Sequence, residues 1–128
     1  MPSTKSIEIF KWTETLSVSE YVSGLGGIAP RMNDIQRRVL VAQYNAPHRG
    51  VTSPQLAELA NVDGGYPIVN AQYGRLGRMF LEQTGNQPDI RDDGYDRLWA
   101  TWSIGYKLPD GWVWEMLPAV AEALEFLG

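Results

Sequence analysis

Residues 51–81 read VTSPQLAELANVDGGYPIVNAQYGRLGRMFL, and this stretch decides the fold that we expect. Its first half predicts a short helix, because Thr52 or Ser53 can cap the amino end and Pro54 suits the first turn, where no N–H is needed. An Asp-Gly-Gly break follows it. The second half predicts a longer helix that begins at Tyr66 and ends near residue 83, with a glycine as its stop.

The two predicted helices and the turn between them form a helix-turn-helix. This arrangement commonly places its later helix in a groove of DNA, although it also occurs where helices simply pack together. One apolar stripe of the later helix is expected to face the core, and it consists of Val69, Tyr73, Leu76 and Phe80. The opposite side carries small and polar residues, namely Pro67, Asn70, Ala71, Gly74, Arg75 and Arg78.

Two glycines, Gly74 and Gly77, lie inside the later helix. Each costs roughly 1 kcal/mol relative to alanine in a helix interior, so a compensating close approach is expected. The approaching group is either another helix or the backbone of a ligand, and the sequence leaves both open.

The flanking sequence predicts the remaining elements. Residues 30–45 predict a helix with Asn33 as a candidate cap, and residues 24–27, rich in glycine, predict a loop. Residues 98–108 and 112–116 predict two tryptophan-bearing strands joined by a Pro-Asp-Gly turn, followed by a last helix from residue 117. A hairpin after three helices occupies the position of the wing in a winged helix.

We therefore expect one α+β domain over residues 1–128. It is winged helix-turn-helix-like, with three helices, a tryptophan-rich β-hairpin and a C-terminal helix. The chain of 128 residues is long enough for a single core, and 44% of it is hydrophobic. It has no long apolar run that would span a membrane and no signal-peptide pattern, and the absence of cysteine fits a cytoplasmic location.

The charge is unevenly distributed. The net charge is −4, which at face value disfavours nucleic acid as a partner. Residues 31–81 nevertheless contain six arginines and three acidic residues, so the acidic excess lies outside them. Arginine suits phosphates and base edges better than lysine does. The simpler interpretation is that these arginines lie on the exposed faces of helices and have no binding role.

Residue types for catalysis are scarce. His48 is the only histidine, cysteine is absent, and no serine lies in a nucleophile-elbow sequence. Four aspartates fall within residues 87–97, but their spacing does not match a calcium loop, and a solvated acidic loop is expected. We expect no enzyme activity, no metal and no cofactor.

The segment RRVLVAQYNAPHRGVTSPQLAELANVDGGYPIVNAQYGRLGR resembles the DNA-reading domain found next to HNH nucleases in modification-dependent (type IV) restriction endonucleases. It is most similar to the sulfur-binding domain, which recognises phosphorothioate-modified DNA. The end of the chain, WVWEMLPAVAEALEFLG, looks like the end of the same domain. The resemblance covers about residues 31–128, and it implies duplex DNA as a partner and a nuclease domain or subunit as another.

The resemblance also implies a shallow apolar pocket for the sulfur of a phosphorothioate. Tyr66 and Pro67 would form its wall, and Ala71, or alternatively Asn70, would form its floor. His48 and Arg49 would lie beside the pocket and hold the neighbouring phosphate oxygens. Contacts to phosphates or bases would come from Gln72, Arg75 and Arg78. The HNH motif itself is missing, and the acidic total departs from an expected basic reader.

Two other functions remain open at this stage. The acidic excess outside residues 31–81 and the tryptophan-rich hairpin also fit a protein-interaction or immunity-type module on a winged-helix scaffold. An ordinary winged-helix transcription regulator is the third candidate, and it would prefer one unmodified operator sequence.

Overall fold

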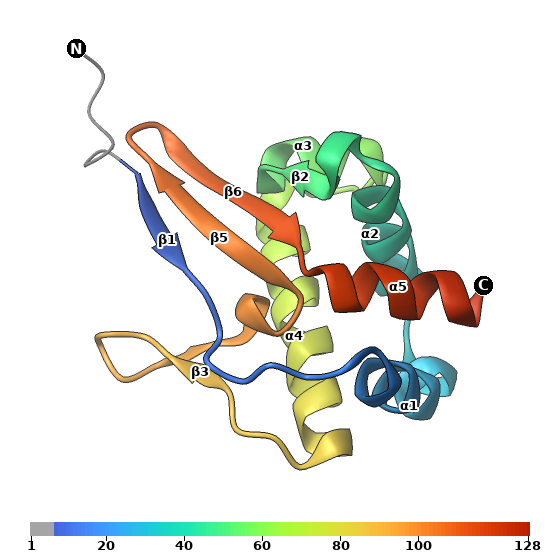
Figure 1. The fold of residues 1–128 in the computed structure, drawn as a ribbon. Helices are drawn as coiled ribbons and strands as arrows, with labels where there is room; N and C mark the ends of the chain where they lie inside the picture. The colour runs from blue at the N-terminus through green and yellow to red at the C-terminus, as the bar shows by residue number, and fades with distance from the viewer. Residues whose placement is uncertain (1–6) are drawn as a thin grey trace.

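The computed structural model describes residues 7–128, where five α-helices are combined with a small antiparallel sheet (Figure 1). The α-helices are α1 (Val18–Ile28), α2 (Asp34–Asn45), α3 (Ser53–Leu59), α4 (Tyr66–Thr84) and α5 (Pro118–Leu127). Short 3-10 turns are η2 (Ala29–Arg31), η3 (Pro47–Arg49) and η4 (Leu98–Thr101). The strands are β1 (Glu8–Phe10), β2 (Gly50–Val51), β3 (Asp89–Ile90), β4 (Asp96–Arg97), β5 (Ser103–Leu108) and β6 (Gly111–Met116).

The predicted pair of helices is present as α3 and α4. Thr52, not Ser53, caps α3: its hydroxyl accepts the Gln55 N–H, and the Gln55 side chain accepts the Thr52 N–H. Gly64 and Gly65 take positive φ values of 92° and 75° in the turn, which favour glycine. The predicted apolar stripe of α4 is buried as expected, at Val69, Tyr73, Leu76 and Phe80.

The prediction of a loop over residues 24–27 was wrong, because α1 continues through them. Ser17 and Glu20 form a capping box at its amino end. A Cβ at Gly24 would lie 2.3 Å from the ring of Phe80 and 2.8 Å from Thr84. Gly24 therefore allows close packing of α1 on α4, and the glycine cluster does not end the helix.

The predicted hairpin is present as β5 and β6, but it forms the centre of a four-stranded sheet in the order β1-β5-β6-β2. Both outer edges of the hairpin are thus paired with other strands (Figure 1). Residues 98–101 were expected to extend the strand but form η4 instead. This turn folds back so that the Trp99 ring lies on Gly105, where a Cβ would be 2.1 Å from the ring.

Several boundaries and faces also differ from the prediction. The helix expected from Pro30 begins at Asp34, because Asn33 caps it. The apolar residues of the α3 segment do not all face the core, because Leu56 and Ala60 are buried whereas Leu59 is 58% exposed. The polar stretch after α4 contains the short β3–β4 pair.

A buried polar network joins the helices to the sheet. The Tyr73 hydroxyl lies 2.6 Å from Gln43 Oε1 and 2.6 Å from Ser103 Oγ. Gln43 Nε2 donates to Ser103 Oγ at 3.0 Å and to the Trp114 carbonyl at 3.3 Å. The Tyr73 ring stacks on Trp114 with their centroids 4.5 Å apart. These contacts fix the rotation of α4 about its axis, and thereby the face that it presents to solvent.

Candidate nucleic-acid interface

The solvent-facing side of α4 is the expected site. With its apolar stripe held in the core, the helix exposes Tyr66, Pro67, Asn70, Ala71, Arg75 and Arg78. Pro67, Ala71, Arg75 and Arg78 follow each other at helical spacing along one side, and Tyr66, which is 52% exposed, and Asn70 lie on the adjoining side. The structure thus exposes six of the nine expected residues on the solvent-facing half of α4.

The two arginines of this face differ in their surroundings. Arg78 Nη2 lies 2.9 Å from Asp96 Oδ2 of β4, so a carboxylate of the protein already partly neutralises its charge. Arg75 is exposed and has no hydrogen bond or ion pair with any residue from 7 to 128. Of the two arginines on this side of α4, only Arg75 therefore has no carboxylate partner within residues 7–128.

Gln72 lies on another side of α4 and contacts α2. Its Oε1 accepts from Asn33 Nδ2 at 3.0 Å and from Gln36 Nε2 at 3.1 Å. Gln36 is buried and its own Oε1 accepts the Asn33 N–H. The predicted DNA contact is therefore engaged in an amide cluster that joins α2 to α4.

Two depressions flank the exposed face of α4. One, of about 320 Å³, lies toward α3 and is lined by Pro54, Ala57, Glu58, Asn61, Val62, Gly65 and Tyr66. The other, of about 340 Å³, lies toward the sheet and is lined by Ser53, Asn70, Gly74, Asp96, Leu98, Trp99, Trp112 and Trp114. Each depression contains one carboxylate, and these carboxylates disfavour an anion directly over them.

Tertiary contacts alone identify the residues that complete these depressions. These residues come from three separate stretches of the chain, with Glu58 in α3, Asp96 and Trp99 in the β4–η4 segment and Trp112 in β6, so no local motif marks them. The sequence predicted tryptophan-bearing strands but did not indicate which of the rings are exposed. Trp112 is in fact 38% exposed.

The glycines of α4 also have a structural explanation. A Cβ at Gly77 would lie 2.6 Å from the carbonyl oxygen of Leu98. The group that approaches α4 is therefore the 3-10 turn η4 of the same chain. It is neither another α-helix nor the backbone of a ligand, the two groups that the sequence left open. Gly74 is less crowded, with a Cβ position 3.7 Å from the Leu98 side chain, and it lines the depression beside the sheet.

His48 and Arg49 form a strained turn between α2 and β2. Their φ values are 55° and 54°, a region that costs non-glycine residues of the order of 1–3 kcal/mol each. Arg49 Cζ lies 4.5 Å above the centroid of the Tyr44 ring, and Arg49 Nη2 lies 3.8 Å from Glu125 Oε1. Arg49 Nε is buried without a hydrogen-bond partner among residues 7–128. Such strain is often found at functional loops.

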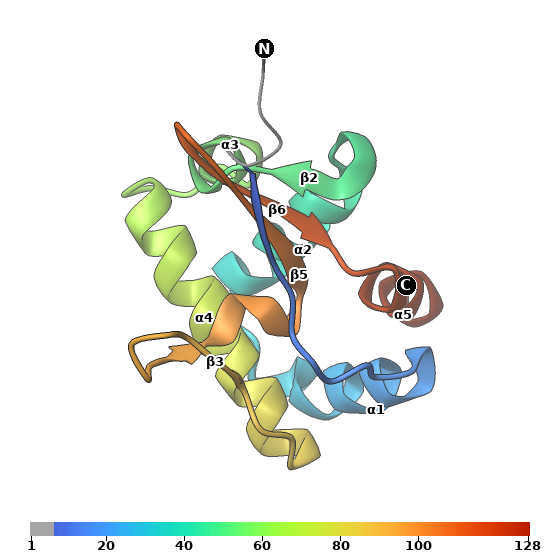
Figure 2. The same cartoon turned by 60° about the vertical axis from the view of Figure 1, so that its left-hand side comes forward.

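This turn does not lie beside Tyr66 and Pro67, as the resemblance had led us to expect. In Figure 2 the turn between α2 and β2 lies on the right and the start of α4 on the left, with β2 and α3 between them. Tyr66 instead lines its depression together with residues of α3. The reason is the pairing of β2 with β6, which carries the turn away from α4.

Other arginines of the central segment bind backbone carbonyls. The Arg37 guanidinium donates to the Ala29 carbonyl. Arg38 Nη1 donates to the carbonyls of Ala60 and Asn61 at 2.6 and 2.7 Å. These side chains keep their charge, but their positions are set by the fold.

Within residues 7–128, no group of three or more histidine and acidic side chains is placed to hold a metal ion, and no helix is long and apolar enough to cross a membrane. Comparison with known proteins adds no family: no protein-family model, no curated protein and no solved structure matches this chain.

Proposed function

We propose that this chain is a non-catalytic reader of modified duplex DNA and that the exposed face of α4 contacts the duplex. One observation carries the proposal. A long helix, preceded by a short capped helix and a tight turn, presents Pro67, Ala71 and Arg75 to solvent on one side, with Tyr66 and Asn70 exposed on the adjoining side. The resemblance to sulfur-binding domains supports a backbone phosphorothioate as the modification.

The apolar part of this face suits sulfur better than oxygen. Sulfur is larger, softer and less strongly hydrated than a phosphate oxygen, so contact with Tyr66, Pro67 and Ala71 costs it less hydration. A single contact of this kind is worth about 1–3 kcal/mol, by analogy with burial of one apolar group. Asn70, exposed between these residues, can donate or accept a hydrogen bond with a base or an oxygen.

The charges of the protein make electrostatic attraction weak. The sequence pI is about 4.9, and only Arg75 and Arg78 contribute cations to the proposed face. Two phosphate contacts give a slope of log K against log salt of about −2. Binding is therefore expected to be measurable at low salt and to weaken only moderately as salt is added.

The first test compares two duplexes of one sequence, of which one carries a single phosphorothioate. The modified duplex is expected to bind about 5- to 150-fold more tightly at low salt, which corresponds to about 1–3 kcal/mol. Equal affinities for the two duplexes would contradict recognition of sulfur. Absence of binding to either duplex would contradict the proposal that the chain binds DNA. Preference for one unmodified sequence would favour an ordinary transcription regulator.

Variants separate the roles within the face. Tyr66→Ala and Pro67→Ala should erode the preference for sulfur, whereas Arg75→Ala should weaken binding to both duplexes about equally. Arg91→Ala is the matched control, because Arg91 is an exposed arginine between β3 and β4 that pairs with Asp93 at 2.8 Å. Arg49→Ala tests whether the strained turn makes a separate contact with DNA.

A further inference from the structure

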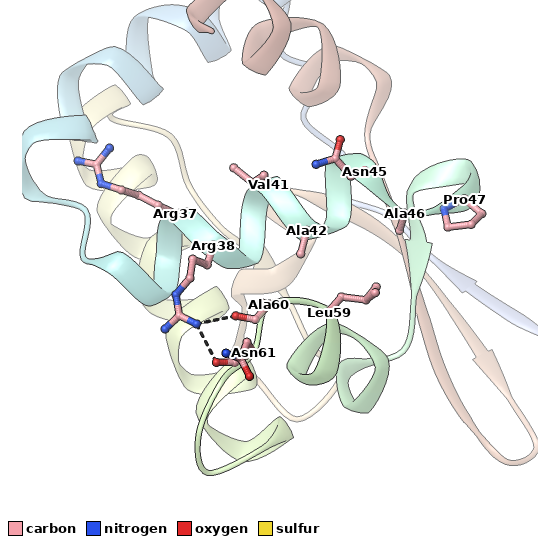
Figure 3. Close-up of a pocket in the computed structure, with 10 residues that line it drawn as sticks. All are labelled: Arg37, Arg38, Val41, Ala42, Asn45, Ala46, Pro47, Leu59, Ala60 and Asn61. Atoms are coloured by element: carbon pink, nitrogen blue, oxygen red, sulfur yellow. Dashed lines mark hydrogen bonds between the residues drawn. The ribbon is translucent and has the colours of Figure 1, made fainter.

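An apolar groove runs between α2 and α3, away from the exposed face of α4. It has a volume of about 560 Å³ and is lined by Arg37, Arg38, Val41, Ala42, Asn45, Ala46, Pro47, Leu59, Ala60 and Asn61 (Figure 3). Val41 and Leu59 are each 58% exposed, although both are aliphatic. Figure 3 shows Leu59 extending from α3 toward the last turns of α2.

The cations of the groove lie toward one end of it. Arg37 and Arg38 come from the first half of α2, and Asn45 and Pro47 lie at the other end. Arg38 donates to the carbonyls of Ala60 and Asn61, just beyond α3, and pairs with Asp34 at 2.9 Å. Arg37 is exposed and donates only to a backbone carbonyl, which leaves its charge without a carboxylate partner among residues 7–128.

The end of α5 combines exposed apolar side chains with negative charge, which complements the apolar and positively charged groove. Phe126 is 77% exposed and Leu127 is 45% exposed, and both lie beside the exposed carboxylates of Glu122 and Glu125. Glu122 and Phe126 are four residues apart and therefore lie on one face, separated by one turn. They combine an acid with a projecting aromatic ring.

The spacing of the two surfaces matches. Arg37 and Val41 on α2 are also four residues apart, so each pair spans about 6 Å along its helix. In a parallel arrangement, Glu122 would face Arg37 while Phe126 contacts Val41 and enters the groove that Leu59 also lines. One register thus satisfies both the charge and the apolar contact.

We propose that this chain self-associates, with the end of α5 of one copy seated in the α2–α3 groove of another. Each chain carries both surfaces, so reciprocal docking closes a dimer in which two grooves are filled. The patch on each chain is small, which predicts a weak, concentration-dependent dimer. This inference does not rest on DNA binding, and the groove is not part of the exposed face of α4.

Sedimentation velocity over a range from about 10 to about 500 µM tests the proposal, a range suited to a weak interface. The wild-type chain is expected to shift toward the dimer mass. Phe126→Glu and Leu59→Asp should each raise the dimer Kd at least about tenfold, because a charge then enters the apolar contact. Both side chains are exposed, so the fold should persist, as circular dichroism can verify. Tyr95→Glu is the matched control, since Tyr95 is 71% exposed on the β3–β4 loop.

A charge exchange tests the register. Arg37→Glu and Glu122→Arg should each weaken self-association, and their mixture should restore association in the heterodimer. A wild-type chain that stays monomeric at all concentrations, or association that neither Phe126→Glu nor Leu59→Asp alters, overturns the proposal. Failure of the mixture to recover overturns the parallel register.

Discussion

At the scale of one residue, Gly77 sets how closely η4 can approach α4. A methyl group there would lie 2.6 Å from the backbone carbonyl of Leu98, which cannot move away as a side chain could. Gly77→Ala is therefore expected to lower the free energy of unfolding by about 1–3 kcal/mol, despite the higher helix propensity of alanine.

Gly26 provides the matched control in α1, because nothing lies within 4 Å of its Cβ position. Gly26→Ala should raise the free energy of unfolding by about 0.5–1 kcal/mol through helix propensity alone. Urea unfolding of the two variants measures both effects. A stabilising Gly77→Ala would show that η4 can shift at little cost.

At the scale of an element, α3 is too short to be stable alone. It has seven residues, whereas isolated helices shorter than about 12 residues are marginal in water. Thr52 caps its amino end, and Arg38 from α2 donates to the carbonyls of Ala60 and Asn61 just beyond its carboxyl end. The position of α3, and thus the start of α4, depends on this arginine.

Arg38→Ala is expected to lower the free energy of unfolding by about 1.5–3 kcal/mol, the range for hydrogen bonds to a charged group. Arg75→Ala is the control, and its effect on stability should stay within about 0.5 kcal/mol because the side chain is exposed. Chemical denaturation compares the two. Equal effects would mean that the Arg38 contacts contribute nothing to α3.

At the scale of the whole molecule, two buried tyrosines join the helices to the segment leading into the sheet. The Tyr21 hydroxyl donates to the Thr101 carbonyl at 2.7 Å, and Tyr73 bonds to Gln43 and Ser103. Burial raises the pKa of both hydroxyls above the ordinary value of 10.0, and Glu20 adds to the effect at Tyr21. Their contribution to stability is therefore fully present below pH 10 and is lost as the pH rises toward the folded-state pKa.

The free energy of unfolding should fall as the pH rises above about 10, because the unfolded chain releases tyrosine protons that the folded chain retains. Tyr73→Phe should make this fall shallower. It should also lower stability near neutral pH by about 1–3 kcal/mol, since Gln43 and Ser103 lose a partner. Urea titrations at several pH values, with Tyr95→Phe as control, measure both. An unchanged slope in Tyr73→Phe would exclude Tyr73 as the group responsible.

The local pattern was sufficient to predict four of the five α-helices and the central hairpin. The Thr52 cap, the two glycines of the turn and the four-residue apolar stripe of α4 all act within one or two turns of chain, and the structure confirms each. The same holds for the hairpin β5–β6, whose turn chemistry is local. The exposed face of α4 followed directly from its buried stripe.

Long-range contacts decided the rest. The glycines of α1 led to the wrong prediction of a loop, because the sequence does not show that Phe80 and Thr84 pack on Gly24. The excess of arginine in the central segment suggested one positive surface. In the structure, however, Arg78 pairs with Asp96, and Arg38 binds the carbonyls after α3. The hydrophobic period of a helix predicts which of its sides is buried. The carboxylate that pairs with an arginine, or the group that packs on a glycine, comes from a distant part of the chain. Only the tertiary structure therefore brings these residues together.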